Sequence, residues 1–407
     1  MRIDIDASNI RAGGALTHLS ETLKAARPAK NGIESVGVWG GRRTLERLPE
    51  RPWLQPMTDP ALNGSLVQRI QWQRAHAARL HEARCAALFV PGGIYTGAFE
   101  PFVAMSQNLL PFVPKERRRF GFSRAYLRYL ILAWAQKATF HRAAGMIFFT
   151  ETSKQIVTAQ TGPLKAQVSI VPLGVGEVFR FTPREQRGPT SFKFEQPFRW
   201  LYVSIINHYK HQWHVAEAVA RLRRQGLPVA LDLVGPAYPP ALRRMRNMLR
   251  QVDPAGEFIR YHGPIPFAHL PEWYRRADGF VFASTCENMP NILLEAMASA
   301  LPIACSDRSP MPEILQHGGQ YFHAEDPGSI AEALGALFTD EALRDRCAQS
   351  AYELSKRYTW ERCAQDTFAA LAAVGGANAG AFPKASMKAR VGDSGASRSM
   401  RGQDPRP

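Results

Sequence analysis

One stretch, residues 279–306, constrains the fold of this chain more than any other. It begins with a glycine and four apolar or aromatic residues, 279–283, which are typical of a buried parallel strand. Apolar residues then recur at helical spacing through 292–300, and a second, largely apolar run occupies 301–305. Strand, turn, helix and strand in this order predict an α/β domain built on a parallel sheet.

The turn between this strand and this helix has the makings of a ligand site. Pro290 suits the first position of a helix, because its missing N–H would have no partner there, and the amides of 291–293 would then be free. Free amides and the helix dipole attract anions, phosphates above all. Glu287 and Glu295 flank the helix start and are placed to accept hydrogen bonds from ligand hydroxyls. The pattern suggests a nucleotide-sugar site; the alternative is a helix-start glutamate and a solvated one.

The same segment carries a family resemblance. Glu287 and Glu295 are separated by seven residues, the second glutamate opens the sequence Glu-Ala-Met-Ala, and Pro302 and the pair at 312–313 follow. This segment resembles the E-x7-E signature of family 4 retaining glycosyltransferases, also called glycosyltransferase group 1. The resemblance implies the GT-B fold, an α/β arrangement in which two Rossmann-like domains with parallel sheets face each other across a cleft.

Composition limits the class of protein. With 407 residues, 45% of them hydrophobic, the chain is long enough for two domain cores. No run approaches the roughly 18 consecutive apolar residues of a spanning helix, and residues 1–6 read as a strand rather than a signal peptide, so a cytosolic protein is expected. The five cysteines are odd in number and lack a C-x-x-C pair, which argues against disulfides and a zinc site. We expect reduced thiols, with Cys286 packed rather than nucleophilic.

The formal net charge of +16 is compatible with nucleic acid, an anionic membrane surface or an anionic substrate. Residues 115–142 hold eight Lys or Arg and one acidic residue, interleaved with aromatic side chains. A basic, aromatic, helix-compatible segment of this kind can lie in the interface of an anionic bilayer. The expected membrane contacts are Arg117, Arg118, Arg119 and Trp134. The alternative is a core helix with a solvated basic face.

The first half of the chain predicts a βαβ unit with a glycine-rich turn. A strand at 3–6 is followed by Gly13 and Gly14 and then by leucines at helical spacing. The two glycines would let backbone amides approach a phosphate or sugar, and their position matches the glycine-rich first loop of the same family. Another strand, 101–105, is followed by Asn108 at the edge where open α/β sheets collect ligands. Asn108 is therefore a candidate acceptor or sugar contact.

The second domain opens with a strand at 200–204 and a helix at 213–223. Between them the chain carries residues 207–211, where the family has G-R-L-x-x-x-K-G. The resemblance implies that Lys210 is the lysine that binds the donor diphosphate. The family's arginine five residues earlier is Ile205 here, so one expected phosphate contact is absent, and His211 or another basic group is a candidate to share its task.

Motifs and composition divide the chain into five parts. Residues 172–175 resemble the P-x-G-V that closes the first domain in this family, and 358–361 resemble the segment where its last helix crosses back. The expected parts are an acceptor-side Rossmann-like domain at 1–178, a polar linker at 179–197, a nucleotide-sugar donor domain at 198–357, a crossing helix at 358–374 and a disordered tail at 375–407.

The resemblance implies a metal-independent, retaining hexosyltransferase that needs no cofactor. It would move a sugar from a UDP- or GDP-sugar to a hydroxyl of a growing bacterial surface glycan, such as lipopolysaccharide, or of a lipid-linked acceptor. The implied donor-binding residues are Gly13, Gly14, Lys210, Glu287, Asn291, Ile292 and Glu295. Glu287 and Lys210 would be catalytic, because Lys210 and the helix amides offset charge on the departing diphosphate while Glu287 holds sugar hydroxyls. Glu295 would hold the ribose.

Other classes of protein share some of these features. A nicotinamide-dependent oxidoreductase should show G-x-G-x-x-G after its first strand, which Gly13 and Gly14 do not supply. A nucleotide-sugar epimerase or hydrolase on the same fold would use the same donor site. A non-catalytic basic protein that binds nucleic acid or membrane explains the charge but not the glutamates, and no nucleic-acid partner is expected. The expected location is the cytoplasm, peripheral on the inner face of the cell membrane.

Overall fold

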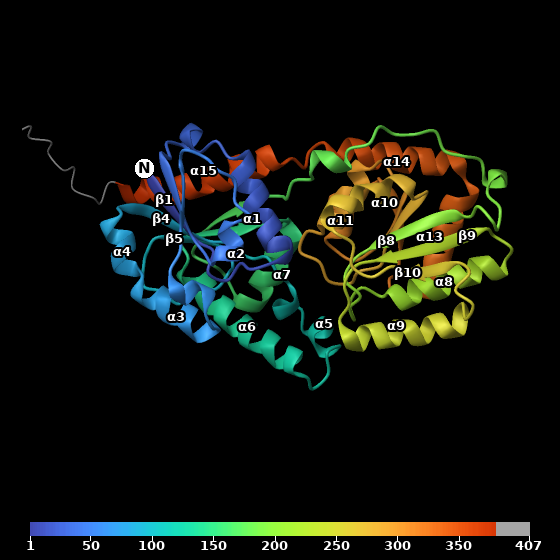
Figure 1. The fold of residues 1–407 in the computed structure, drawn as a ribbon, viewed down its shortest axis with the longest axis horizontal. Helices are drawn as coiled ribbons and strands as arrows, with labels where there is room; N and C mark the ends of the chain where they lie inside the picture. The colour runs from blue at the N-terminus through green and yellow to red at the C-terminus, as the bar shows by residue number, and fades with distance from the viewer. Residues whose placement is uncertain (380–407) are drawn as a thin grey trace, which may run out of the picture.

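Two parallel sheets, formed one after the other along the chain, organise the molecule (Figure 1). The computed structural model describes residues 1–379. The first sheet has seven strands in the order β3-β2-β1-β4-β5-β6-β7, and the second has six in the order β10-β9-β8-β11-β12-β13. Every pairing between these strands is parallel, which confirms the predicted pair of α/β domains.

Strands and helices alternate throughout, as the apolar runs of the sequence predict. The first sheet contains β1 (Arg2–Asp6), β2 (Ser35–Trp39), β3 (Leu54–Met57), β4 (Cys85–Val90), β5 (Phe102–Met105), β6 (Gly145–Phe148) and β7 (Gln167–Ile170). The second contains β8 (Phe198–Val203), β9 (Val229–Val234), β10 (Ile259–Tyr261), β11 (Gly279–Phe282), β12 (Ile303–Ser306) and β13 (Gly319–Phe322). The helices are α1 (Gly13–Ala25), α2 (Arg42–Leu45), α3 (Leu66–Ala75), α4 (Ala77–Glu82), α5 (Pro114–Arg118), α6 (Arg124–Arg142), α7 (Glu151–Thr161), α8 (Gln212–Arg224), α9 (Pro239–Val252), α10 (Leu270–Arg276), α11 (Asn291–Ala298), α12 (Met311–Leu315), α13 (Pro327–Thr339), α14 (Glu341–Ser355) and α15 (Trp360–Ala379).

Both sheets reverse their strand order next to their first strand. In the first sheet β1 lies between β2 and β4, and in the second β8 lies between β9 and β11. Open α/β sheets bind ligands outside the carboxyl ends of their strands at such a reversal. Gly13 begins α1, the helix after β1, and the loops after β8 and β11 carry Lys210 and Glu287. The topology therefore gathers these sequence candidates at the two places where the fold is suited to bind a ligand.

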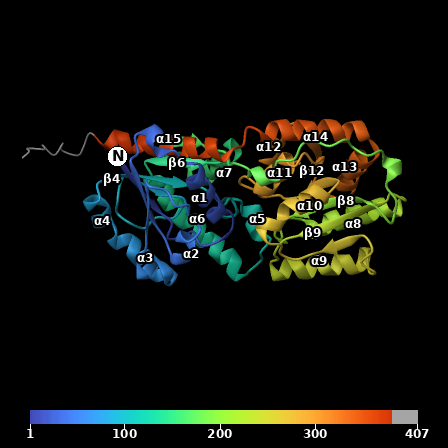
Figure 2. The same cartoon turned by 45° about the horizontal axis from the view of Figure 1, so that its top comes forward.

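The last helix returns to the first domain. α15 packs against α1 and β4, and Figures 1 and 2 show it continuing along the edge of the molecule on which α14 lies. The chain that leads into α15 contacts the predicted P-x-G-V segment. Val175 N donates to the carbonyl of Tyr358 at 3.1 Å, and a Cβ on Gly174 would overlap the backbone of Trp360. Glycine at 174 therefore allows the crossing chain to approach closely.

Some boundaries and elements differ from expectation. α15 continues to Ala379 rather than ending at 374, and residues 380–407 of the expected tail lie outside the described residues. The other domain boundaries stay predictions. The spacing of Leu66, Ile70, Ala77 and Leu80 predicts one helix over 65–84 with these side chains facing inward. The structure instead has two helices there, α3 and α4, and Leu66 is 57% exposed. α9 was not predicted, although Ala241, Met245, Leu249 and Val252 recur at helical spacing along it and pack on the core.

The basic segment 115–142 forms α5 and α6. Ser123 caps α6 by accepting a hydrogen bond from Tyr126 N at 3.3 Å. Only Gln136, Thr139 and Phe140 of its 19 residues are buried, so α6 packs on the domain through its C-terminal half and exposes much of its remaining surface. Within residues 1–379, no helix is both long and apolar enough to cross a bilayer.

Candidate active site

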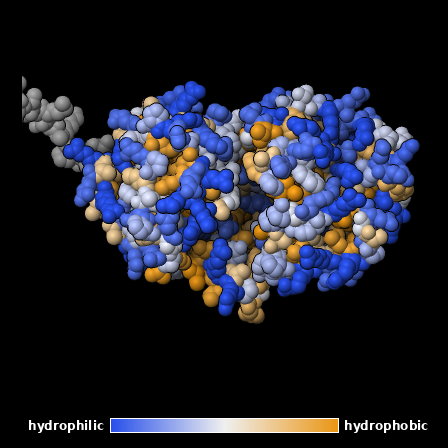
Figure 3. Space-filling view, viewed as in Figure 1, coloured by the Kyte–Doolittle hydropathy of each residue, from blue (hydrophilic) through white to orange (hydrophobic). Residues whose placement is uncertain are grey.

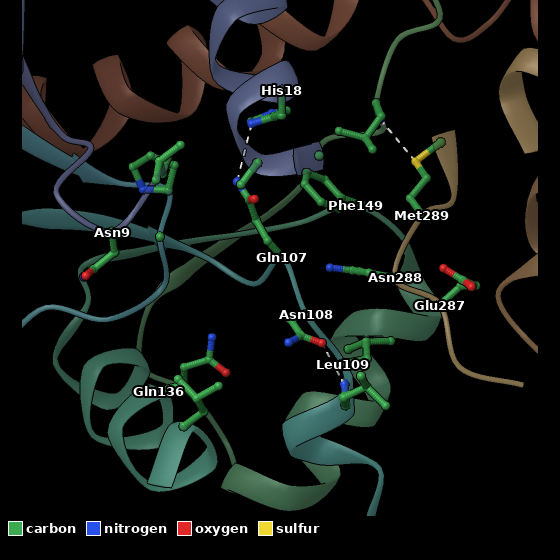
Figure 4. Close-up of a pocket in the computed structure, with 18 of the residues that line it drawn as sticks. Asn9, His18, Gln107, Asn108, Leu109, Gln136, Phe149, Glu287, Asn288 and Met289 are labelled. Carbon is green, nitrogen blue, oxygen red and sulfur yellow. Dashed lines mark hydrogen bonds between the residues drawn. The ribbon is translucent and has the colours of Figure 1, made fainter. Parts of the chain in front are cut away.

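A cavity of about 540 Å³ lies between the two sheets. The first domain lines it with the start of α1, the loops after β4 and β5, and one face of α6, while the second domain lines it with the loop that leads into α11. Figure 3 shows the hollow between the two halves of the molecule, and Figure 4 shows side chains from both halves around it. The cavity therefore lies where the strand-order reversals of the two sheets meet.

Lys210 and Glu287, the expected catalytic residues, form an ion pair. The Lys210 Nζ donates a hydrogen bond to Oε1 of Glu287, and the Ser284 hydroxyl donates to the same oxygen. The ammonium also lies 5.1 Å from the centre of the Phe282 ring, and Lys210 is only 5% exposed. Because each buried charge is compensated by the other, a ligand phosphate must displace Glu287 from Lys210 or join the pair.

A tight turn after β8 presents Lys210 to Glu287. His211 has φ +52°, a left-handed conformation that is uncommon for a residue other than glycine. Lys210 N donates to the carbonyl of Asn207 at 3.0 Å. Tyr202 then joins the two loops of the site: its hydroxyl donates to the carbonyl of Lys210 and accepts from Ala283 N at 3.2 Å. The loop after β8 is thereby held against the loop after β11.

His211 does not replace the missing arginine. It is fully buried, its Nε2 lies 3.2 Å from Oγ1 of Thr285, and burial lowers the pKa of its ring to about 3. A neutral imidazole adds no positive charge at neutral pH. Ile205, at the arginine position, offers only its carbonyl, which accepts from the side chain of Gln212 at 2.9 Å. Lys210 is therefore the cation of this loop.

The start of α11 faces the glycine turn of the first domain. Pro290 is the N-cap of α11, not its first residue, and its carbonyl accepts from Leu293 N at 3.0 Å. The amides of 291–293 were expected to be free. Leu293 N is bonded to Pro290, so the amides of Asn291 and Ile292 are the two that have no partner among residues 1–379. A Cβ on Gly14 would lie 3.9 Å from Nδ2 of Asn291, and the neighbouring Gly13 has φ +69°, which favours glycine.

Glu295 lies on the buried side of α11. It is 7% exposed, and its Oε2 accepts a hydrogen bond from the hydroxyl of Tyr274 at 2.8 Å. Burial raises the pKa of this carboxyl to about 7, and the bond from Tyr274 opposes part of that rise. Glu295 does not line the cavity that Glu287 lines. Its expected contact with a ribose stays a prediction.

Unpaired amide groups line the cavity. Asn288 donates from Nδ2 to the carbonyl of Ser106 at 2.6 Å, but its Oδ1 is buried without a partner among residues 1–379, as are Oδ1 of Asn291 and Oε1 of Gln136. Buried polar groups are nearly always hydrogen-bonded. Three such acceptors around one cavity suit a ligand rich in hydroxyl groups. Asn108, the predicted contact, lines the same cavity and caps its own loop by accepting from Leu110 N at 3.1 Å.

Asn288 and Gln136 were not singled out from the sequence. An isolated amide side chain has no characteristic spacing, and Gln136 lies in a segment whose charge dominated its interpretation. Asn288 offered a weak positional signal, because it directly follows Glu287 in the loop that precedes α11.

Two other titratable side chains of the cavity are held neutral. Burial lowers the pKa of His18 to about 4, and its Nδ1 lies 3.5 Å from Nε2 of Gln107. Burial, with the nearby Glu287 carboxylate, raises the pKa of the Cys286 thiol well above its usual range. This confirms Cys286 as a packed residue, and all five cysteines are buried and free.

The expected membrane contacts divide into exposed and bonded residues. Trp134 is 74% exposed and Arg118 is exposed. Arg117 is partly buried and donates to the carbonyl of Pro111. The guanidinium of Arg119 is bonded to Glu116 and, across the cleft, to Glu325. The membrane contacts stay predictions.

Arg119 belongs to a contact between the domains. It donates to Glu116 at 2.6 Å and to Glu325, in the second domain, at 2.8 Å. Glu116 is itself buried and accepts from the hydroxyl of Thr285, two residues before Glu287, at 2.8 Å. The loop that carries Glu287 is therefore fixed to the first domain as well as to its own.

A family model described as glycosyl transferases group 1 matches residues 197–340. The matched segment includes Lys210, Glu287 and Glu295. The match covers about a third of the chain and agrees with the family that this part of the sequence resembles.

Curated relatives match parts of the chain. The O-antigen chain mannosyltransferase B of Escherichia coli is 29% identical over 110 residues, which are 27% of this chain and 29% of that protein. The D-inositol 3-phosphate glycosyltransferase of Paenarthrobacter aurescens is 23% identical over 233 residues, 55% of this chain and 56% of that protein. The chain thus spans less than two thirds of the length of either relative.

Solved structures resemble the chain over most of its length. HepE of Anabaena, solved in complex with UDP, aligns with a TM-score of 0.64 at 17% identity and covers 90% of this chain and 98% of its own. WaaG, a glycosyltransferase involved in lipopolysaccharide biosynthesis, aligns with a TM-score of 0.65 at 16% identity, covering 91% and 99%. The likeness confirms the predicted GT-B fold.

Proposed function

We propose that this chain is a retaining glycosyltransferase that moves a sugar from a UDP- or GDP-sugar to a hydroxyl of a growing bacterial surface glycan or a lipid-linked acceptor. The observation that carries the proposal is the ion pair between Lys210 and Glu287, whose side chain lines the cavity together with Asn291 at the start of α11, inside the segment that matches the group 1 glycosyl transferases. The UDP bound to HepE and the involvement of WaaG in lipopolysaccharide biosynthesis support the donor and acceptor classes.

Donor binding begins with an exchange at Lys210. In the free protein its ammonium is bonded to Glu287. A diphosphate is a stronger partner for the ammonium because it carries more negative charge, and the amides of Asn291 and Ile292 add the attraction of a helix N-terminus. Release from Lys210 frees the Glu287 carboxylate to accept hydrogen bonds from the hydroxyls of the donor sugar.

Leaving-group stabilisation supplies the main catalytic effect. As the bond between the sugar carbon and the phosphate oxygen breaks, negative charge grows on the diphosphate beside Lys210 and the start of α11. The acceptor hydroxyl forms its new bond on the same face of the sugar, and its proton passes to the departing phosphate oxygen. The unpaired amides of Asn288, Asn291 and Gln136 hold hydroxyls of the two sugars in place.

A screen of UDP-, GDP- and ADP-sugars for thermal stabilisation tests the donor class, because a ligand that binds the native state raises its Tm. We expect UDP- or GDP-sugars to raise the Tm of the wild type, and Glu295→Ala to weaken that effect strongly. Product analysis with labelled donor then separates the alternatives. Transfer yields labelled glycan, whereas free sugar or an altered nucleotide-sugar as the only product would assign a hydrolase or an epimerase.

A further inference from the structure

An exposed apolar stripe runs along α6. Leu127, Leu130, Ile131 and Trp134 are 58%, 37%, 57% and 74% exposed. They recur at i, i+3, i+4 and i+7, and therefore form one face of the helix that is about 100° wide. Five of the eleven large hydrophobic side chains exposed in residues 1–379 lie between Phe122 and Trp134. Figure 3 shows apolar surface at the lower edge of the first domain, where Figure 1 places α6.

Basic side chains border this stripe on both sides. At 3.6 residues per turn, Arg124 and Arg128 lie along one border and Lys137 along the other. Neither arginine has an ion pair or a side-chain hydrogen bond to any residue between 1 and 379. The single acidic residue of the segment, Glu116, is buried and bonded to Arg119. The exposed face of α6 is therefore apolar at its centre and cationic at its edges.

A second face of the same helix lines the candidate active site. Arg128, Leu132 and Gln136, at i, i+4 and i+8, are all part of the cavity wall. Gln136 contributes one of the buried, unpaired amide oxygens. Arg128 sits where the two faces meet, because it borders the apolar stripe and also lines the cavity. A single helix thus connects the outer surface to the acceptor side of the cleft.

Of the occupants that could cover the stripe, an anionic bilayer fits best. Apolar side chains insert below lipid headgroups while flanking Arg and Lys meet the anionic headgroups, and tryptophan favours that depth. A second copy of the chain would bring the same cationic borders together, which like charges oppose. Nucleic acid would satisfy the cations but would leave Leu127, Ile131 and Trp134 in water.

We propose that α6 docks the protein on an anionic membrane surface through Leu127, Leu130, Ile131 and Trp134, and that Arg128 binds an anionic group of an acceptor carried in that membrane. The inference rests on the proposed function and narrows its acceptor to one class: a membrane-borne glycolipid with a phosphate or other anionic group near the sugar that receives the transfer.

Vesicle sedimentation tests the docking face. The triple variant Leu127→Ser, Ile131→Ser, Trp134→Ser is expected to bind vesicles of equal parts phosphatidylglycerol and phosphatidylcholine at least about tenfold more weakly than the wild type. The control variant Leu66→Ser, Val67→Ser removes side chains of similar exposure, 57% and 62%, from α3 and should bind as the wild type does. Equal binding by the triple variant and the wild type would overturn the proposal, as would equal binding to pure phosphatidylcholine.

A second measurement separates the alternatives to a bilayer. If sedimentation equilibrium showed the wild type to dimerise and the triple variant to stay monomeric, with no vesicle binding by either, the stripe would be a contact between copies and the proposal would fail. Stabilisation by UDP should be the same in the triple variant and the wild type. If UDP did not raise the Tm of the wild type, the proposed function would be contradicted, but the vesicle result would still stand.

Arg128 is tested against Arg124, its neighbour one turn earlier. Dodecyl phosphate, below its micelle concentration, serves as a probe with an anionic head on an alkyl chain, and dodecyl maltoside serves as the uncharged comparison. Arg128→Gln should weaken binding of dodecyl phosphate about tenfold and leave dodecyl maltoside unaffected, whereas Arg124→Gln should change either within about twofold. Equal effects of the two substitutions on dodecyl phosphate would contradict the role given to Arg128.

Discussion

Burial, more than sequence spacing, sets the charge of individual residues around the cleft. His18 and His211 have pKa values lowered to about 4 and about 3 because their rings are buried, so both are neutral where a general acid would need a proton. Lys210 keeps a charge partner in Glu287. Glu295 has no such charge partner among residues 1–379: its carboxyl is buried and accepts a hydrogen bond from the hydroxyl of Tyr274.

Glu295 is expected to make stability depend on pH. Its pKa rises from 4.5 to about 7 on folding, so between these values the unfolded chain loses a proton that the folded chain keeps. The free energy of unfolding therefore falls as pH increases, by about 3 kcal/mol over the whole window. Glu295→Gln cannot ionise and still accepts from Tyr274, so its Tm advantage over the wild type should grow between about pH 5 and about pH 8. A Tm difference that is the same at both pH values would contradict this account.

At the scale of elements, the segment that crosses between the domains depends on one glycine. Gly174 precedes the linker, and a Cβ there would overlap the backbone of both Thr359 and Trp360 at the start of α15. Gly176, two residues later, has room: its added Cβ would meet only Val178 and Phe179 at ordinary contact distances of 3.7 and 3.8 Å. Neither glycine has a positive φ, so the two positions differ in space and not in backbone conformation.

Gly174→Ala should therefore destabilise the protein, because overpacking against backbone forces the crossing chain to move. The expected loss is about 1–3 kcal/mol in the free energy of unfolding, whereas Gly176→Ala should stay within about 0.5 kcal/mol of the wild type. Thermal unfolding of the two variants side by side checks this. A Gly174→Ala protein as stable as Gly176→Ala would mean that α15 docks differently.

At the scale of the whole molecule, side chains bridge the two domains around the cavity. Asn288 donates to the carbonyl of Ser106, and the Glu313 carboxylate accepts from the first amides of α7, those of Glu151 and Thr152, at 2.8 and 3.0 Å. A carboxylate at a helix N-terminus is favourable in itself. The Asn288 bond and the Arg119 contact hold the loop before α11 against the first domain, and the Glu313 bonds join α12 to α7.

Arg119→Gln should loosen this arrangement. It leaves Glu116, a buried carboxylate, without its cationic partner, which is expected to lower the free energy of unfolding by about 3 kcal/mol. Arg118→Gln is the matched control, because Arg118 is exposed and makes no ion pair among the described residues, so its effect should stay within about 0.5 kcal/mol. Equal Tm values for the two variants would contradict a stabilising contact between Arg119 and Glu116.

The sequence was sufficient for the two parallel sheets and for the gathering of Glu287, Lys210 and Gly14, because short apolar runs followed by glycine or proline turns have few other solutions. The helical spacing of Ala241, Met245, Leu249 and Val252 also indicates α9, which was missed, whereas no pattern indicates the partners of Arg119. A run of three arginines gives no sign of which one turns toward a carboxylate 206 residues away. Long-range partners of that kind depend on how the domains pack.

We propose that Lys210 and Glu287 form the donor diphosphate and sugar site of a glycosyltransferase. The most direct measurement is the rate of transfer of labelled sugar from the UDP- or GDP-sugar that stabilises the protein, compared between the wild type and Lys210→Gln. We expect transfer by the wild type and a fall in kcat/KM of about a hundredfold or more in the variant, because the charge on the leaving diphosphate loses its cation. A folded Lys210→Gln protein that transfers sugar as fast as the wild type would contradict it.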